Sequence, residues 1–237
     1  MKYPLPPRPE LGTHQGLAYA LFKPQVEPRA AVVILHGAGS AKESHFDFAR
    51  TALAYDFAAI AFDARGHGRS EGAFGPQAIE DVLAICAFAR RHAPHLALRG
   101  SSLGGMLAIH GAAAEGDADA VVAICPAPED FLLRGLRSGR IDGFAADRHA
   151  LEPWLETLDL RVSAASLGPR CALLLLHARG DEQVPYTVSE ELIDCAREPK
   201  RLLLMPGGHH RSIQHDLELQ GESLSFIERA VAGRVRG

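Results

Sequence analysis

The sequence predicts an α/β fold in which helices cover both faces of a mostly parallel central sheet. Short runs rich in Val, Ile, Leu and Ala alternate along the chain with stretches of helical period, the pattern that builds parallel sheets by crossover connections. Each run is continuously apolar, which is typical of strands buried on both faces. At 237 residues, 47% of them hydrophobic, the chain is expected to form one domain, residues 1–237, with a full core.

The expected elements follow one another in a regular order. An antiparallel edge strand is predicted for the stretch GLAYALF from Gly16. The predicted strands of the main sheet are AVVILHG from Ala31, AAIAFDARG from Ala58, LALRGSS from Leu96, AVVAICP from Ala120, CALLLLHARGD from Cys171 and RLLLMPGG from Arg201. Helical periodicity begins near Glu43, Pro76, Leu103, Val188 and Ile213.

One segment, residues 126–168, breaks this rhythm. It contains Phe131, Phe144 and Trp154 among several charges and shows no obvious strand. Because it is too long for an ordinary connection, we expect a small helical insertion that lies over one end of the sheet as a cap or lid. Its three aromatic residues could either line a pocket or pack the insertion onto the sheet.

Two adjacent serines, Ser101 and Ser102, follow the strand from Leu96, and only Ser102 lies at the centre of a known motif. Gly100-Ser101-Ser102-Leu103-Gly104 is a G-x-S-x-G sequence between a predicted strand and a predicted helix, the context of a nucleophile elbow. Ser102 occupies its centre, and glycines two residues before and after it relieve crowding in a strained turn. The alternative is a glycine-rich turn that binds phosphate, but the spacing of the known phosphate loops is absent.

A serine nucleophile needs a base, and the base needs an acid that fixes its tautomer. Asp181 follows the strand from Cys171, and the pair His209 and His210 follows the strand from Arg201. Asp181 could instead cap the following helix or form an Asx turn. Glu129 and Asp130 are rival candidates for the acid, while Glu182 is expected to be a solvated neighbour of Asp181.

The motifs LHGAGSAKES, FDARGHGRSEG, GSSLGG, ARGDEQVP and PGGHH span nearly everything from residue 31 to 210. Together they resemble the α/β-hydrolases of the bacterial serine esterase, lipase and aminopeptidase-like group, in which the triad follows the chain order Ser, Asp, His. The resemblance implies Ser102 as nucleophile, Asp181 as acid and a histidine of the last loop as base, with His210 favoured over His209. It also implies an eight-stranded sheet whose first strand this short N-terminus could shorten or lack.

The same resemblance assigns roles to residues around the proposed nucleophile. Asp63, Arg65 and Ser70 of the FDARGHGRSEG motif are implied to be scaffold or rim residues, and His36 is implied to orient backbone next to the oxyanion loop. An acyl-transfer oxyanion needs preorganised N–H donors. The expected donors are the backbone N–H of Leu103, directly after the nucleophile, and that of Ala38, beside Gly37, which allows close backbone approach.

Composition excludes several classes of partner. The formal net charge of -4 gives no reason to expect nucleic acid, and no apolar stretch predicts a membrane span or a leader, so a cytoplasmic protein is expected. No metal site is predicted, and His45, His67 and His215 are expected in loops or at the surface. The cysteines are expected to be buried without disulfides; they are Cys86, Cys125, Cys171 and Cys195.

The sequence-based hypothesis is therefore a serine hydrolase that cleaves carboxylic esters (class 3.1.1) with small or medium acyl groups and needs no cofactor. Its partner would be a small-molecule substrate, and the oligomeric state stays open between monomer and homodimer. Amide, thioester and carbon–carbon bond hydrolases use the same triad on this fold and remain alternatives. A non-catalytic ligand-binding protein of the same fold is the alternative from another class.

Overall fold

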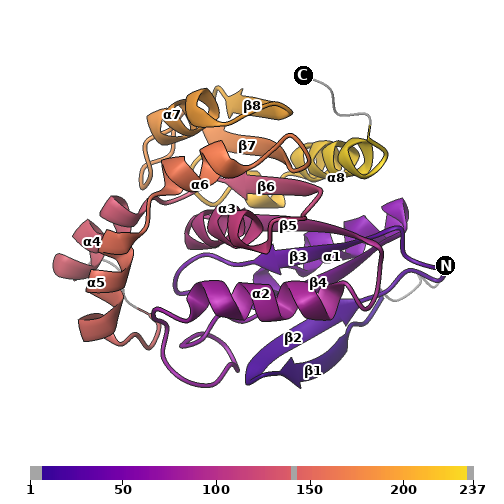
Figure 1. The fold of residues 1–237 in the computed structure, drawn as a ribbon, viewed down its shortest axis with the longest axis horizontal. Coiled ribbons are helices and arrows are strands. Elements are labelled where there is room, and N and C mark those ends of the chain that lie inside the picture. Colours follow the sequence, from indigo (N-terminus) through magenta and orange to yellow (C-terminus); the bar gives the residue numbers. More distant parts are fainter. Residues whose placement is uncertain (1–6, 140–142, 234–237) are drawn as a thin grey trace, which may run out of the picture.

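The computed structural model describes residues 7–139 and 143–233, and its centre is one mixed sheet (Figure 1). The sheet has eight strands in the order β1-β2-β4-β3-β5-β6-β7-β8. Only the pairs β1–β2 and β2–β4 are antiparallel, so the prediction of a mostly parallel sheet is confirmed. The strands are β1 (Glu10–His14), β2 (Leu17–Phe22), β3 (Ala30–Leu35), β4 (Phe57–Phe62), β5 (His95–Ser101), β6 (Ala120–Ile124), β7 (Ala172–Ala178) and β8 (Lys200–Met205).

The N-terminal hairpin corrects two expectations. Strand β1 is present, and it pairs with β2 from Glu10 opposite Leu21 to His14 opposite Leu17. The stretch from Gly16 is therefore not the edge strand, because β1 occupies that edge. Sequence patterning missed β1 because its one large apolar residue, Leu11, is 60% exposed. A turn with positive φ at Gln15 and Gly16 matches the twist of a tight hairpin.

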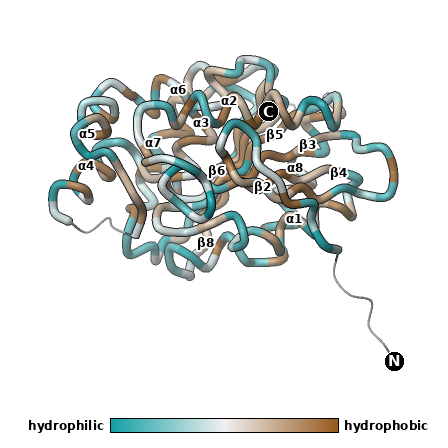
Figure 2. The backbone as a smooth tube through the Cα atoms, turned by 90° about the horizontal axis from the view of Figure 1, so that it is seen from below, coloured by the Kyte–Doolittle hydropathy of each residue, from teal (hydrophilic) through white to brown (hydrophobic). Residues whose placement is uncertain are grey.

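Helices cover both faces of the sheet, in two layers (Figure 1). One layer holds α2 (Ala78–Ala89), α3 (Leu103–Glu115), α6 (Leu160–Ser166) and α7 (Thr187–Cys195); the other holds α1 (Phe46–Ala52) and α8 (Leu217–Val231). Short 3-10 helices lie at η1 (Lys42–His45), η2 (Leu53–Tyr55) and η3 (Ile213–His215). Figure 2 shows hydrophobic backbone gathered along the central strands and hydrophilic backbone in the outer turns. Every residue of β3, β4 and β7 is buried, as expected for strands covered on both faces.

Between β6 and β7 the chain forms α4 (Glu129–Arg137), α5 (Arg148–Thr157) and α6. Helices α4 and α5 lie together beyond one end of the sheet (Figure 1). Phe144 stacks on the ring of His67 at 4.3 Å between centroids, and Trp154 meets Phe74 edge-on at 6.2 Å. These two aromatics therefore pack the segment onto the loop that follows β4, whereas Phe131 lines the cavity described below.

Several expectations about cysteines and histidines need correction. All four cysteines are free thiols, but Cys195 is exposed because it ends α7 at the surface, while the other three are buried. His45 and His67 are 1% and 4% exposed, so neither lies at the surface; His67 does lie in a loop, as expected, whereas His45 ends the 3-10 helix η1. His67 is buried by the rings of His36 and Phe144. None of the helices in the described part of the chain is both long and apolar enough to cross a membrane.

Candidate active site

Ser102 occupies a strained turn at the end of β5. Its backbone has φ 56° and ψ -117°, a conformation that L residues rarely adopt and that is characteristic of functional sites. A Cβ on Gly100 would overlap the backbone carbonyl of Gly104, and a Cβ on Gly104 would overlap the carbonyl oxygen of Leu35. Both flanking positions of the G-x-S-x-G motif therefore have no room for a side chain.

Hydrogen bonds from the neighbouring strand hold this turn in place. The Ser102 N–H donates to the Ile124 carbonyl at 2.8 Å, and the Ala127 N–H donates to the Ser102 carbonyl at 3.2 Å. Both partners belong to β6 or the loop after it, so the turn is anchored on the adjacent parallel strand. Because hydrogen bonds engage both the N–H and the carbonyl of Ser102, the backbone that carries its side chain is held in this strained conformation.

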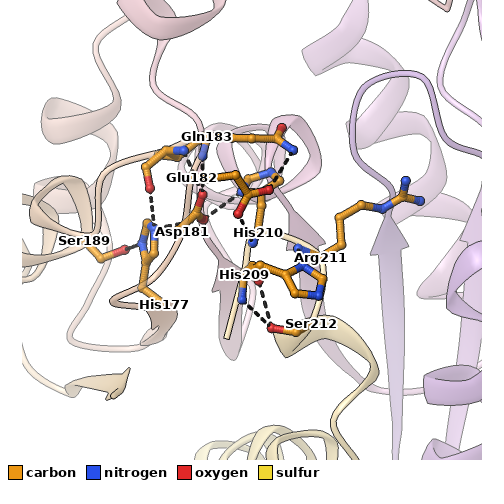
Figure 3. Close-up of polar contacts among 10 residues, drawn as sticks. His177, Asp181, Glu182, Gln183, Ser189, His209, His210, Arg211 and Ser212 are labelled. Carbon is orange, nitrogen blue, oxygen red and sulfur yellow. Dashed lines mark hydrogen bonds and ion pairs between the residues drawn. The ribbon is translucent and has the colours of Figure 1, made fainter. Parts of the chain in front are cut away.

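Asp181 and His210 meet at the ends of β7 and β8 (Figure 3). The Nδ1–H of His210 donates to Asp181 Oδ2 at 2.7 Å, and the Asp181 side chain is fully buried. Oδ1 of Asp181 meanwhile accepts the N–H groups of Gln183 and Val184 at 2.8 and 2.9 Å. Asp181 is thus both the partner of a histidine and the anchor of an Asx turn, and the two interpretations of this residue are compatible.

The environment keeps the Asp181 carboxyl ionised. Burial raises the pKa of this group, but hydrogen bonds from His177, His210 and the Val184 N–H outweigh burial and hold its pKa well below the usual range. A carboxylate that stays charged can orient an imidazole ring and stabilise the imidazolium that forms when the ring takes up a proton.

The last loop presents His210, and not His209, to this carboxylate. His210 is 5% exposed, and its backbone N–H donates to Glu182 Oε2 at 3.1 Å. His209 is exposed and forms a local turn, in which Ser212 Oγ accepts its N–H and donates to its carbonyl. Glu182 is exposed as expected, but it also supports the loop that carries His210.

The rival acids make other contacts. Glu129 Oε1 lies 2.5 Å from Nε2 of His110 on α3. Asp130 is exposed and forms an ion pair with Arg134 one helical turn later. The structure therefore brings Asp181, and neither of these two residues, to His210.

Ser102 and His210 line one cavity of about 350 Å³. Among the described residues no hydrogen bond joins the Ser102 hydroxyl to the His210 ring. Catalytic hydrogen bonds often tighten only when substrate is bound, so the shared cavity is the informative observation. The cavity is lined by Gly37, Ala38, Gly39, Ser40, Ser101, Ser102, Phe131, Leu132, Gly143, Gln183, His210, Arg211 and Gln214.

The loop after β3 lies against the serine. A Cβ on Gly37 would stand 3.5 Å from the Cβ of Ser102, and Ala38 lines the same cavity. Leu103 is the first residue of α3, where a backbone N–H has no acceptor within the helix. The two N–H groups predicted to bind an oxyanion thus come from backbone that borders the Ser102 side chain.

His36 fixes the shape of that loop. Its Nδ1–H donates to the Gly37 carbonyl at 2.8 Å, and its Nε2 accepts the Ala64 N–H at 3.1 Å. Burial is the main reason why the pKa of His36 is lowered to about 4. The ring is therefore neutral at pH 7 and joins the loop after β3 to the loop after β4, as the resemblance implied.

The FDARGHGRSEG motif forms a scaffold beneath this loop. Asp63 is completely buried, and it pairs with Lys42 Nζ at 2.7 Å while accepting the Arg69 N–H at 2.9 Å. Ser70 Oγ donates to the Asp63 carbonyl and accepts the Ala18 N–H. Arg65 forms an ion pair with Asp81 on α2. These contacts tie the loop to β2 and α2.

Sequence reasoning missed His177, which supports Asp181 from within β7. Its Nε2–H donates to the Val184 carbonyl at 3.0 Å and lies 3.3 Å from Asp181 Oδ2, while Nδ1 accepts the Ser189 hydroxyl at 2.7 Å. The signal was a histidine inside an apolar strand, four residues before the acid.

Cys125 is the second missed residue. It has φ 44° at the end of β6, and its Sγ lies within 4.8 Å of possible ligand atoms of Asp181 and His210. This trio could in principle hold a metal ion, but burial raises the pKa of the Cys125 thiol far above its usual range. Because a metal binds the thiolate, and because His210 Nδ1 already donates to Asp181, the trio fits a histidine–carboxylate pair better than a metal centre.

Comparisons with known proteins find a similar family for the first part of the chain and a similar fold for nearly all of it. A family model described as serine aminopeptidase, S33 (Hydrolase_4) matches residues 26–132. The match includes the loop after β3 and Ser102, and it ends before Asp181 and His210. The uncharacterized protein YfhR of Escherichia coli (strain K12) is 28% identical over 188 residues, covering 76% of this chain. The chain spans only 63% of the length of that relative.

Solved structures share the fold across nearly the whole chain. Est1E from Butyrivibrio proteoclasticus, with ferulic acid bound, has a TM-score of 0.77 at 22% identity and covers 94% of this chain and 99% of its own. The α/β hydrolase GrgF from Penicillium sp. sh18 has a TM-score of 0.76 at 17% identity, covering 96% of this chain and 100% of its own. The chain therefore has the α/β-hydrolase fold, and residues 26–132 are similar to the serine aminopeptidase family.

Proposed function

We propose that this protein is a serine hydrolase that cleaves carboxylic esters of small or medium acyl chain length. The observation that carries the proposal is the hydrogen-bonded pair of His210 and Asp181 at the cavity that Ser102 lines from a strained turn. A serine in a strained turn, a nearby imidazole and an ionised buried carboxylate together form the arrangement that activates a serine hydroxyl.

In the proposed mechanism, Ser102 Oγ attacks the ester carbonyl carbon while His210 Nε2 takes the hydroxyl proton. The N–H groups of Ala38 and Leu103 stabilise the negative charge on the former carbonyl oxygen. The bond to the alcohol then breaks, and the alcohol leaves with the proton from His210. Water next attacks the acyl-enzyme, gives a proton to His210, and the carboxylic acid is released as that proton returns to Ser102 Oγ.

The small cavity supports the proposed size of the acyl group. A volume of about 350 Å³ lies at the low end of the range for small-molecule sites. Helix α4 supplies Phe131 and Leu132 to the wall, so we propose that residues 126–168 act as a cap over the site. Amide, thioester or carbon–carbon bonds could be cleaved by the same groups.

The test is the hydrolysis of p-nitrophenyl acetate by four variants. Ser102→Ala and His210→Ala should lose at least about a thousandfold in kcat, whereas Ser101→Ala and His209→Ala are the matched controls and should stay within a few-fold of the wild type. Near wild-type turnover in Ser102→Ala or His210→Ala would exclude the proposed mechanism. A chain that binds esters but turns none over would favour a ligand-binding protein.

A further inference from the structure

The candidate active-site cavity has an uneven distribution of polar groups. Phe131 and Leu132 supply an apolar wall, while Gln183, Arg211 and Gln214 supply side chains that can donate hydrogen bonds. Of the described residues that line this cavity, Arg211 alone carries a permanent charge, and none is a carboxylate. A substrate in this cavity therefore meets one full positive charge that none of the lining residues in the described part of the chain neutralises.

Arg211 directly follows His210, and its backbone is held by the local turn of the last loop. The Arg211 N–H lies 3.4 Å from His209 Nδ1, and Ser212 closes the turn by bonding to the backbone of His209. Figure 3 shows the Arg211 side chain extending away from Asp181 and Glu182. The guanidinium is thus directed away from the two acidic residues that follow β7.

The Arg211 guanidinium forms no ion pair with a carboxylate of the described residues. Other arginines of the chain are paired in this way, for example Arg65 with Asp81 and Arg90 with Glu115. An arginine presents a planar set of donors that matches the two oxygens of a carboxylate. An unpaired guanidinium at the edge of a reaction cavity is therefore available to bind an anionic group of the substrate.

The side-chain amide of Gln214 adds to the preference of this cavity for an anionic group. Gln214 is 6% exposed and lines the same cavity, and its amide contacts the His215 ring at 2.8 Å, which leaves it further hydrogen-bonding capacity. A guanidinium and amide groups together offer donors to a carboxylate without a competing negative charge. The opposite case, a cationic ester, would meet like charge and no carboxylate on this wall.

We propose that Arg211 is a specificity-determining residue that binds a free carboxylate of the substrate, so that the preferred substrates are esters carrying a negative charge near the scissile bond. The proposal rests on the proposed ester hydrolase function. The carboxylate can belong to the acyl part, as in a monoester of a dicarboxylic acid, or to the alcohol part, as in an acylated hydroxy acid. Both share the same chemistry at Arg211.

The experiment compares charged esters with neutral esters of the same shape. In the first pair, monomethyl succinate carries a carboxylate on the acyl part, and methyl succinamate carries an amide at the same position. In the second pair, acetoxyacetate carries a carboxylate on the alcohol part, and acetoxyacetamide carries an amide there. The kcat/KM of each pair is measured by product release for the wild type and for the variants Arg211→Gln, Arg211→Lys and Arg211→Glu. Arg197→Gln is the control, because Arg197 is exposed, lies outside the cavity and carries the same charge.

We expect the wild type to prefer the charged ester of at least one pair by about tenfold in kcat/KM, the effect of one charge-assisted hydrogen bond at a partly solvated site. The pair that shows the preference identifies the side of the ester that carries the carboxylate. Arg211→Gln should remove the preference mainly through KM, Arg211→Lys should retain part of it, and Arg211→Glu should reverse it. The kcat/KM of the neutral esters should fall less than that of the charged esters in Arg211→Gln, and Arg197→Gln should behave as the wild type.

Equal kcat/KM for the charged and neutral esters in the wild type would overturn the role of Arg211. An equal loss on both esters in Arg211→Gln would overturn it too, because that pattern indicates a general role in folding or in the transition state. These results differ from failure of the proposed function, in which no ester is hydrolysed in a Ser102-dependent way.

Discussion

The oxyanion loop depends on a histidine that must stay neutral, and this requirement predicts an acid sensitivity that can be measured. His36 is 3% exposed, and burial lowers its pKa from 6.5 to about 4. Between these two pH values the unfolded chain binds a proton at His36 that the folded chain does not bind, so stability is lost as the pH falls from 6.5 to 4. At about 1.4 kcal/mol for each pH unit, the loss attributable to His36 is about 3 kcal/mol.

The assay is urea unfolding followed by circular dichroism at pH 7.5 and pH 4.5, for the wild type and His36→Asn. Asparagine can still donate to the Gly37 carbonyl but does not titrate. His45 and His67 also have lowered pKa values because of burial, and they contribute to the acid loss of both proteins. The free energy of unfolding of the wild type should therefore fall by about 2 to 3 kcal/mol more than that of His36→Asn. Equal losses in the two proteins would refute the reasoning.

Two further predictions concern the elbow and the acid. Gly104→Ala should destabilise the protein by about 2 kcal/mol or more, because its Cβ meets the backbone of Leu35, which no rotamer change can relieve. Gly221→Ala on α8 should instead stabilise the protein by about 0.5 to 1 kcal/mol, because the nearest atom to its Cβ, Tyr55 Oη, lies at 4.0 Å and leaves room for a methyl group. Both changes are measured by urea unfolding. Asp181→Asn should reduce kcat on p-nitrophenyl acetate by about 10⁴-fold with little change in KM, because it removes the carboxylate that fixes the His210 tautomer; a loss under tenfold would contradict that role.

The parts of the site that sequence reasoning predicted are those that local chemistry restricts most. The two glycines around Ser102 are required by backbone collisions that the structure displays at both positions. Asp181 and His210 follow strands that end at one edge of a parallel sheet, and such ends converge whatever the details of the loops. The fold class could also be predicted from the sequence, because continuously apolar strands are typical of a parallel sheet that helices cover on both faces.

The parts that could not be predicted depend on tertiary packing. Strand β1 carries almost no apolar signal and forms because a tight turn returns it along β2. The burial of His45 and His67 is decided by rings and an arginine far away in the chain. His177 supports Asp181 through contacts with the loop after β7 and with α7. A single sequence does not reveal which side chains the folded chain brings into contact.

The central claim, that Ser102 is a nucleophile activated by His210, is tested most directly by labelling with a fluorophosphonate probe and locating the adduct by tandem mass spectrometry. The account predicts one adduct on Ser102, abolished in Ser102→Ala, retained in Ser101→Ala and formed far more slowly in His210→Ala. An adduct on another residue, or labelling of Ser102→Ala at the wild-type rate, would contradict it.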